Sequence, residues 1–359
     1  MGAADTLRRH VVEKKKMKIC FATYPSVMIL KGGPRTQIFQ TKAALEEHGV
    51  QVTMFNSWED FHPESFDLVH VFGANIGSYH FAREFHKLGI PMAVSPIFFS
   101  RHSPLFVRAA KSVDGIIRAI ARGVWTDYGL VAEICRWSSA VLPNTGHEAD
   151  LVHRGLGIPP EKITVIPNGV EKRFRNGDPS LFVSTYGISN FILNVGHIGP
   201  VRKNVLRLIN ALERIRHPAV IIGRVEDNDY ARKCAEAAKR NERLLMLDSI
   251  AHDSEMLASA YAAADLFALP STFETPGIAA LEAGLAGAKI VITPNGGTKE
   301  YFGSYAEYVE PSSEELIHHG IVTALNKPKN SELRDHIAKE FLWESVGKKT
   351  KDAYERMLP

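Results

Sequence analysis

The chain has 359 residues, more than one hydrophobic core usually serves, so we expect two domains of ordinary size. Its 45% hydrophobic and 23% charged residues are typical of a globular protein and exclude a disordered or low-complexity chain. The net charge of +3 is too small to indicate nucleic-acid binding, and the sequence lacks the long uncharged apolar run that a membrane-spanning helix requires.

The amino-terminal segment and the cysteines indicate the compartment. Residues 1–17 are basic but lack the apolar centre of a secretory signal. Cys20, Cys135 and Cys234 lie far apart, without the paired spacing of a zinc site or a disulfide framework. We therefore expect reduced thiols and a cytoplasmic protein.

From Lys18 onward, short β-rich apolar runs alternate with segments of helical period, which predicts an α/β fold with parallel sheets covered by helices. The first series of predicted strands covers 18–24, 50–55, 67–72, 91–95, 140–143 and 163–167. A second series covers 191–195, 219–222, 244–247, 265–269, 289–293 and 305–309. The repeated alternation predicts two Rossmann-like domains facing a central cleft.

The segment 168–179 separates the two series and is rich in Gly, Asn, Pro and charge, which is typical of an interdomain linker. We expect a first domain over 17–172 and a second over 173–342. The closing segment 343–359 has the pattern of an amphipathic helix, which we expect to pack back onto the first domain.

Between residues 105 and 124 the sequence predicts a two-faced helix. Arg108, Lys111, Arg118 and Arg122 form a basic stripe opposite Phe106, Val113, Ile117 and Ile120. We expect the apolar face to be buried and the basic stripe to be solvated. The alternative is a surface for anionic lipid or a phosphate-linked lipid acceptor, which would bring the protein to the inner membrane face.

The strongest functional signal follows the predicted strand 265–269. Thr275 suits an N-cap, Pro276 suits the first helical position, and Gly277 leaves room for a ligand. A helix that begins here directs its free amides and the positive end of its dipole at the ligand edge of the sheet. The pattern therefore predicts an anion site.

A second loop of the same kind follows the predicted strand 191–195. It begins with Gly196 and His197, and Arg202 and Lys203 precede the next helix. Charge-assisted hydrogen bonds from such side chains to phosphate are about twice as strong as neutral ones. We expect this loop to hold a diphosphate.

Glu274 and Glu282, separated by seven residues and followed by Ala-Gly, resemble the donor-site signature of group 1 (family 4) retaining glycosyltransferases, which have the two-domain B-type fold. Gly296, Gly297 and Glu300 resemble the Gly-Gly-x-x-Glu loop of that family. The resemblance implies that Glu274, with the donor-binding residues Thr275 to Ile278, approaches the sugar and its diphosphate. It also implies that Glu282 accepts hydrogen bonds from the ribose hydroxyls.

The first half of the chain carries weaker signals. Gly32 and Gly33 resemble the family's glycine loop after the first strand, where a backbone without side chains can approach the donor diphosphate. The chain departs from the family in two places. His197 stands where Arg is usual, and Ser95-Pro96 replaces a His that many relatives carry, for which His102 is the nearest substitute.

The resemblance implies a retaining glycosyltransferase that moves a sugar from a nucleotide-diphosphate sugar to a hydroxyl of a saccharide or lipid-linked acceptor, in polysaccharide or glycolipid assembly. We expect neither a metal nor another cofactor, with Glu274, Lys203, Arg202 and His102 as the catalytic candidates. The alternatives are a nucleotide-sugar epimerase or phosphorylase of the same fold, and a binding subunit without catalytic activity.

Overall fold

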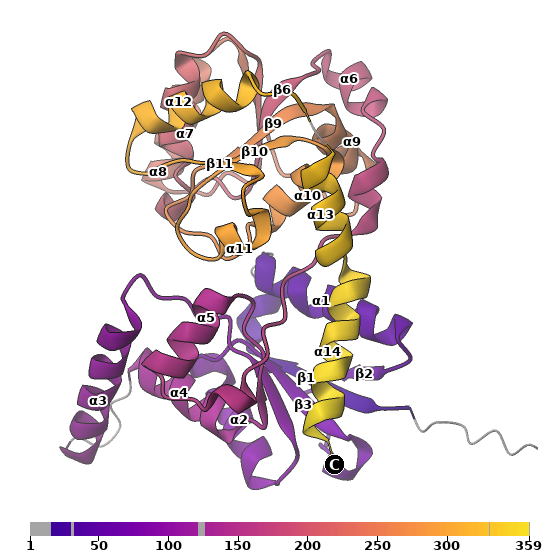
Figure 1. The fold of residues 1–359 in the computed structure, drawn as a ribbon, viewed down its shortest axis with the longest axis vertical. Coiled ribbons are helices and arrows are strands. Elements are labelled where there is room, and N and C mark those ends of the chain that lie inside the picture. Colours follow the sequence, from indigo (N-terminus) through magenta and orange to yellow (C-terminus); the bar gives the residue numbers. More distant parts are fainter. Residues whose placement is uncertain (1–15, 30–31, 121–125, 330, 359) are drawn as a thin grey trace, which may run out of the picture.

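The computed structural model describes residues 16–29, 32–120, 126–329 and 331–358, without the side chains of 115–120. The chain forms two α/β domains, one above the other, each built around a parallel sheet (Figure 1). This confirms the predicted fold class.

The first sheet has five strands in the order β2-β1-β3-β4-β5, all paired in parallel. The strands are β1 (Lys18–Thr23), β2 (Gln51–Met54), β3 (Leu68–Phe72), β4 (Met92–Ser95) and β5 (Ala140–Val141). The helices of this half are α1 (Gly33–Glu47), α2 (Ile76–Lys87), α3 (Pro104–Ile120), α4 (Asp127–Trp137) and α5 (Gly146–Asp150).

The strand predicted at 163–167 is wrong. Only Ile163 makes a bridge, to Val141, although Ile166 also donates its N–H to the carbonyl of Pro143 at 2.9 Å. Proline has no N–H to donate, so Pro143 and Pro167 interrupt the ladder that would extend β5 and its neighbour.

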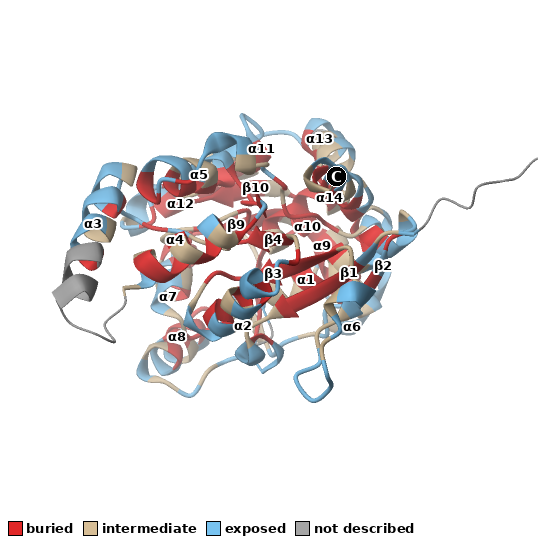
Figure 2. Ribbon diagram, turned by 90° about the horizontal axis from the view of Figure 1, so that it is seen from below, coloured by how far each residue is buried: buried red, intermediate tan, exposed pale blue. Residues whose placement is uncertain are grey.

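The second sheet has six strands in the order β11-β10-β9-β6-β7-β8. They are β6 (Phe191–Val195), β7 (Ala219–Ile222), β8 (Leu244–Leu247), β9 (Ala264–Leu269), β10 (Lys289–Ile292) and β11 (Ala306–Tyr308). The helices of the second half are α6 (Ser180–Tyr186), α7 (Val205–Glu213), α8 (Asp229–Lys239), α9 (Glu255–Ala263), α10 (Ile278–Ala286), α11 (Thr298–Phe302), α12 (Glu314–Leu325) and α13 (Glu332–Glu340). The central strands are buried on both faces, as Figure 2 shows, which is why they read as continuous apolar runs.

The last helix, α14 (Trp343–Met357), leaves the second domain and packs against α1 of the first (Figure 1). Gly347 permits the close approach, since a Cβ there would lie 2.7 Å from the Cβ of Ala44. The boundary between residues 172 and 173 stays a prediction.

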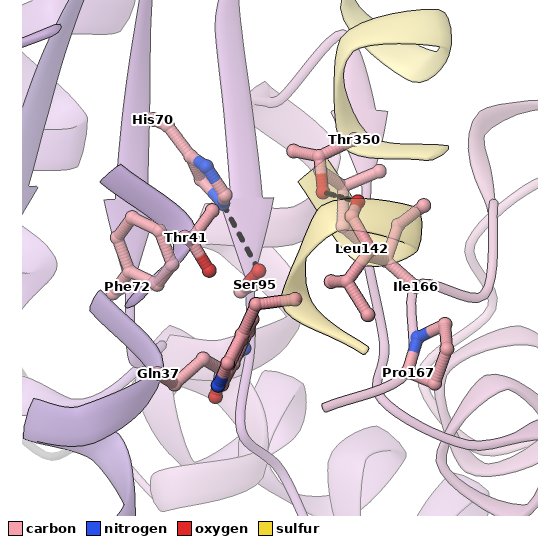
Figure 3. A pocket seen from close by; sticks show the side chains of 11 residues that line it. Gln37, Thr41, His70, Phe72, Ser95, Leu142, Ile166, Pro167 and Thr350 are labelled. Carbon is pink, nitrogen blue, oxygen red and sulfur yellow. Dashed lines mark hydrogen bonds between the residues drawn. The ribbon is translucent and has the colours of Figure 1, made fainter. Parts of the chain in front are cut away.

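A polar cluster fastens α14 to the first sheet. The imidazole of His70 is buried and hydrogen-bonds Tyr354 through Nδ1 at 2.6 Å and Ser95 through Nε2 at 3.0 Å. It borders a small cavity of about 10 Å³, close to the space that one water molecule needs (Figure 3). Burial lowers the pKa of His70 to about 3, so the ring is neutral in the folded protein.

This buried imidazole predicts an acid-sensitive contribution to stability. Below the ordinary pKa near 6.5, His70 is protonated in the unfolded chain but not in the folded one, so the free energy of unfolding falls as the pH drops from 6.5 toward 3. Between pH 6.5 and 5, the free energy of unfolding of the wild-type protein should fall by about 2 kcal/mol more than that of His70→Gln. Urea unfolding of both proteins at several pH values checks this, and parallel stability curves would contradict it.

The predicted helix at 105–124 forms as α3, but of the described residues on its two predicted faces only Arg108 is exposed as expected. Phe106 and Val113 are half-exposed, whereas Lys111 is partly buried and donates from Nζ to the carbonyl of Leu156 at 2.8 Å. Periodicity shows that a helix has two faces but not which of them packs against the domain. Arg122 lies outside the described residues, as do the side chains of Arg118, Ile117 and Ile120.

In the part of the chain that the structure describes, no helix combines the length and the hydropathy needed to cross a bilayer.

Candidate functional site

Two loops of the second domain bring opposite charges together at the carboxyl edge of its sheet. Lys203 ends the short 3-10 turn Val201–Lys203 after β6, and Glu274 follows β9. Lys203 Nζ lies 2.6 Å from Glu274 Oε1, and a guanidinium nitrogen of Arg202 lies 3.9 Å from the same oxygen. Glu274 is 8% exposed, so its charge interacts with both cations through a medium poor in water.

Backbone contacts fix this pairing. Asn204, directly after Lys203, is buried and donates its side-chain amide to the carbonyls of Pro270 and Pro311, at 2.9 and 2.7 Å. It adopts a left-handed conformation with φ of 59°, which Asn tolerates better than most residues. The N–H of Thr272 also donates to the carbonyl of Arg202 at 2.8 Å. Hydrogen bonds therefore hold the two loops together.

The helix after Glu274 starts later than predicted. The prediction placed Thr275 at the N-cap and Pro276 at the first helical position, but α10 begins at Ile278 with Gly277 as its N-cap. Glu274 forms a parallel bridge with Gly296: its N–H donates to the carbonyl of Asn295 and its carbonyl accepts the N–H of Gly297, both at 3.1 Å, which keeps the chain extended. Gly277 then makes the turn with φ of 72°, a conformation that favours glycine.

The later start moves the free helix amides by a few residues, and the anion site stays a prediction. The first amides of a helix have no partner within it, so those that open α10 lie a few residues after Glu274, at the same sheet edge. An anion at this edge could accept hydrogen bonds from the helix amides and from Lys203 and Arg202. Glu274 contributes the one negative charge of this group of residues.

Glu282 belongs to a separate cluster inside the second domain. It is buried and accepts hydrogen bonds from Tyr261 Oη at 2.6 Å and from His252 Nε2 at 2.7 Å. The other nitrogen of His252 lies 3.3 Å from Glu171, which precedes the second domain. The hydrogen bond to Glu282 raises the pKa of His252. A carboxylate offers about four acceptor positions, so Glu282 retains acceptor capacity for ligand hydroxyls.

The Gly-Gly-x-x-Glu segment joins the domains. Glu300 accepts the N–H groups of Gly146 and His147 at the start of α5, at 2.5 and 2.9 Å. Tyr301 Oη donates to the carbonyl of Asn144 and accepts the N–H of Asn168, both at 2.8 Å. The loop of the second domain that follows β10 is therefore held against the first domain.

Further contacts cross between the domains beside Glu274. Arg101 donates to Thr272 Oγ1 at 2.9 Å, and the rings of Phe99 and Phe273 stack with centroids 5.3 Å apart. A Cβ on Gly33 would lie 3.8 Å from Ile278. The predicted glycine loop, whose other member Gly32 is the exposed N-cap of α1, therefore lies next to the first residue of α10.

The remaining predicted site residues are Gly196 and His197, at the start of the loop that carries Lys203, and His102 in the first domain. Gly196 packs backbone to backbone with Gly223, where a Cβ would lie 1.7 Å from the Gly196 carbonyl oxygen. His197 is half-exposed, with Nδ1 3.8 Å from Glu226 on the loop after β7. His102 is exposed before α3 and stacks on Phe106, with centroids 4.2 Å apart. The roles predicted for these residues stay predictions.

Sequence reasoning missed three residues that position the site, namely Asn204, His252 and Tyr261. Asn204 had a detectable signal, because it follows a basic turn and precedes a helix. His252 and Tyr261 reach Glu282 only through the fold, 30 and 21 residues away along the chain.

Within the described ranges, no group of three His, Cys, Asp or Glu side chains has the arrangement of a metal site. The expectation that the protein needs no metal ion stays a prediction.

Two family models match the chain, one in each domain. The model of glycosyl transferases group 1 matches residues 184–341, and the model of glycosyltransferase family 4 matches residues 52–174. The first match contains both glutamates and the Arg202–Lys203 pair.

Two curated relatives that match the chain are distant in sequence. D-inositol 3-phosphate glycosyltransferase of Segniliparus rotundus is 28% identical over 223 residues, which is 59% of this chain and 47% of that protein. An uncharacterised glycosyltransferase of Methanocaldococcus jannaschii is 26% identical over 217 residues, 55% of each chain. The chain thus spans about half the length of the curated relatives it matches.

Solved structures share the fold over nearly the whole chain. Sucrose-phosphate synthase of Thermosynechococcus elongatus aligns with a TM-score of 0.72 and 16% identity, over 95% of this chain and 99% of that one. The Anabaena protein HepE, solved with UDP and glucose, aligns with a TM-score of 0.69 and 18% identity, over 94% and 99%. The two family models, one in each domain, show that the chain belongs to the group 1 (family 4) glycosyltransferases. The solved structures share its two-domain B-type fold.

Proposed function

We propose that this protein is a retaining glycosyltransferase that transfers a sugar from a nucleotide-diphosphate sugar to a hydroxyl acceptor. The observation that carries the proposal is the meeting of Lys203, Arg202 and Glu274 beside the start of α10. A pyrophosphate placed there receives hydrogen bonds from helix amides and from two cations, which is the combination that stabilises a phosphate leaving group. The Anabaena protein HepE, which shares this fold, was solved with UDP and glucose.

In this proposal each residue has one task. Arg202 and Lys203 neutralise the diphosphate, and Glu282 accepts hydrogen bonds from the ribose hydroxyls. The bond between the sugar's anomeric carbon and the diphosphate oxygen breaks, and the carboxylate of Glu274 stabilises the positive charge that develops on the sugar. The acceptor hydroxyl attacks from the same face, and its proton passes to the departing phosphate. His102 and His197 have no assigned step.

Positioning and electrostatic stabilisation supply the rate in this scheme. The scheme has no step that requires a metal ion. The first domain would present the acceptor. Contacts across the domains keep it next to the donor loops, and they are made by Arg101, Phe99 and Glu300. We place the reaction in polysaccharide or glycolipid assembly in the cytoplasm.

A transfer assay tests the function directly. The protein is incubated with UDP-, GDP- and ADP-sugars, with and without a mixed acceptor pool, and the release of nucleoside diphosphate is measured. We expect release that depends on the acceptor, and a product whose anomeric proton coupling matches that of the donor. An epimer or hydrolysis product formed equally without acceptor would instead support the epimerase or phosphorylase reading.

If the donor raises the melting temperature of the protein but is never consumed, the protein is a binding subunit and the catalytic proposal is wrong.

A further inference from the structure

Large apolar side chains are exposed in the segments that follow the strands of the first sheet. Ile29 lies after β1, Ile76 after β3 and Phe99 after β4, and their exposed fractions are 77%, 72% and 55%. Ligands of open parallel sheets bind at this edge. These residues therefore stand on the side of the first domain from which an acceptor reaches the donor, and we call them the acceptor edge.

The loops of the acceptor edge are neighbours. The chains leaving β3 and β4 continue side by side, because Gly73 and Ala74 donate their N–H groups to the carbonyls of Ser95 and Pro96, both at 2.8 Å. The loop after β1 meets the start of α2 at Tyr24, whose Cβ would lie 2.8 Å from a Cβ on Gly77. In the sequence, Ile76 directly precedes Gly77, and Ile29 follows Tyr24 by five residues.

The end of this edge is fixed beside Glu274. The buried carboxylate of Glu148 accepts the N–H of Phe98 at 2.7 Å and that of Asn144 at 2.7 Å. Ile97 adopts φ of 51°, a costly conformation for a β-branched residue. The loop is thereby directed so that Phe99 stacks on Phe273, the residue before Glu274. The apolar edge leads to the proposed point of transfer.

The charged residues of the same segments are all basic. Residues 17–45, 68–83 and 85–113 contain no Asp or Glu, whereas they include Arg35, Arg101 and Arg108. Carboxylates commonly accept hydrogen bonds from sugar hydroxyls, and these segments contain no carboxylate side chain. Apolar side chains with guanidinium groups among them suit an anionic, apolar molecule instead.

The same character continues onto α3, which projects from the side of the first domain (Figure 1). Leu105 is 70% exposed, Phe106 and Val113 are half-exposed, and the exposed Arg108 lies on the same helix. A helix with an exposed apolar face and flanking cations binds the boundary between lipid head groups and acyl chains.

We propose that the acceptor is a lipid with an anionic, phosphate-bearing head group, held with its chain along the acceptor edge and delivered from a membrane on which α3 rests. This inference rests on the proposed function and names the acceptor class for it. The head group supplies the attacking hydroxyl near Glu274, while Arg101 and Arg108 face its phosphate and the anionic surface.

Binding of n-alkyl phosphates tests the acceptor edge without requiring turnover. Butyl, octyl and dodecyl phosphate are titrated into the full chain by calorimetry, below their micelle concentrations, beside inorganic phosphate and dodecyltrimethylammonium. Burying methylenes on a partly open surface predicts about tenfold tighter binding from butyl to octyl phosphate. The ammonium compound, with the same chain and opposite charge, should bind at least about tenfold more weakly than dodecyl phosphate.

Single substitutions locate the site. Phe99→Ser and Ile76→Ser should each weaken dodecyl phosphate binding about fivefold or more, by the loss of apolar contact. Leu88→Ser is the matched control, because Leu88 is 54% exposed but lies at the far end of α2, away from the acceptor edge. Lys203→Met should leave the affinity for alkyl phosphates unchanged, which shows that they do not occupy the diphosphate site.

Vesicles test the role of α3. The protein should float with phosphatidylglycerol vesicles and not with phosphatidylcholine vesicles, and Phe106→Ser with Val113→Ser should abolish the flotation. Affinity that is independent of chain length, equal loss in Leu88→Ser, or transfer to free saccharides as efficient as to lipids overturns this inference. Nucleoside diphosphate binding is measured separately, so its failure would count against the proposed function and not against the acceptor class.

Discussion

Glu274→Gln is expected to lower kcat about a hundredfold to a thousandfold while it tightens the binding of free nucleoside diphosphate several fold. Lys203 Nζ lies 2.6 Å from Glu274 Oε1. Removing the carboxylate frees the lysine for the diphosphate, so binding improves. The same change removes the charge that stabilises the sugar as the bond breaks, a loss of the size seen when one electrostatic stabiliser is deleted.

The opposite directions of the two effects make this prediction specific. Calorimetry with the nucleoside diphosphate and steady-state kinetics with the donor sugar measure them separately. Glu236→Gln, on the exposed face of α8, is the matched control and should change neither. If Glu274→Gln weakens diphosphate binding and leaves kcat unchanged, Glu274 is a structural partner of Lys203 and has no part in the reaction.

Glu282→Ala is expected to weaken nucleoside diphosphate binding about tenfold to a hundredfold and to leave inorganic pyrophosphate binding unchanged. Hydrogen bonds to a charged group contribute about 1.5–3 kcal/mol, and the ribose would lose its acceptor. Lys203→Met should weaken the binding of both ligands, because its charge faces the phosphates.

Glu282 is also a structural residue, so a control must separate the two roles. Tyr261→Phe removes the buried hydrogen bond to Glu282 but leaves the carboxylate in place. It should lower stability by about 1–2 kcal/mol with little loss of nucleotide affinity. Equal losses of affinity in Tyr261→Phe and Glu282→Ala would contradict a direct contact between Glu282 and the ribose.

Much of the fold was predictable because each central strand is a short apolar run bounded by turn residues. Phe191–Val195 and Ala219–Ile222 occur where the sequence predicted them. The contact between Lys203 and Glu274 was also predictable from the sequence. The carboxyl ends of parallel strands lie at one edge of the sheet, and the two residues follow neighbouring strands.

The rest depended on contacts between distant segments. Thr275 has the stronger N-cap preference, but the backbone pairing of Glu274 with Gly296 delays the helix to Ile278. The partners of Glu282 come from α9 and the loop before it, which no local pattern connects to α10. For α3 the helix was predicted correctly, yet Lys111 is partly buried against Leu156 while Phe106 and Val113 are exposed, which the periodicity alone could not show.

The most direct test of the central claim is a crystal structure of the protein with a bound nucleoside diphosphate. We expect the diphosphate oxygens within about 3 Å of the first amides of α10 and of Lys203 Nζ, with the ribose hydroxyls on Glu282. Density for the diphosphate anywhere else, or a Lys203 that contacts only Glu274 with the ligand present, would contradict the account.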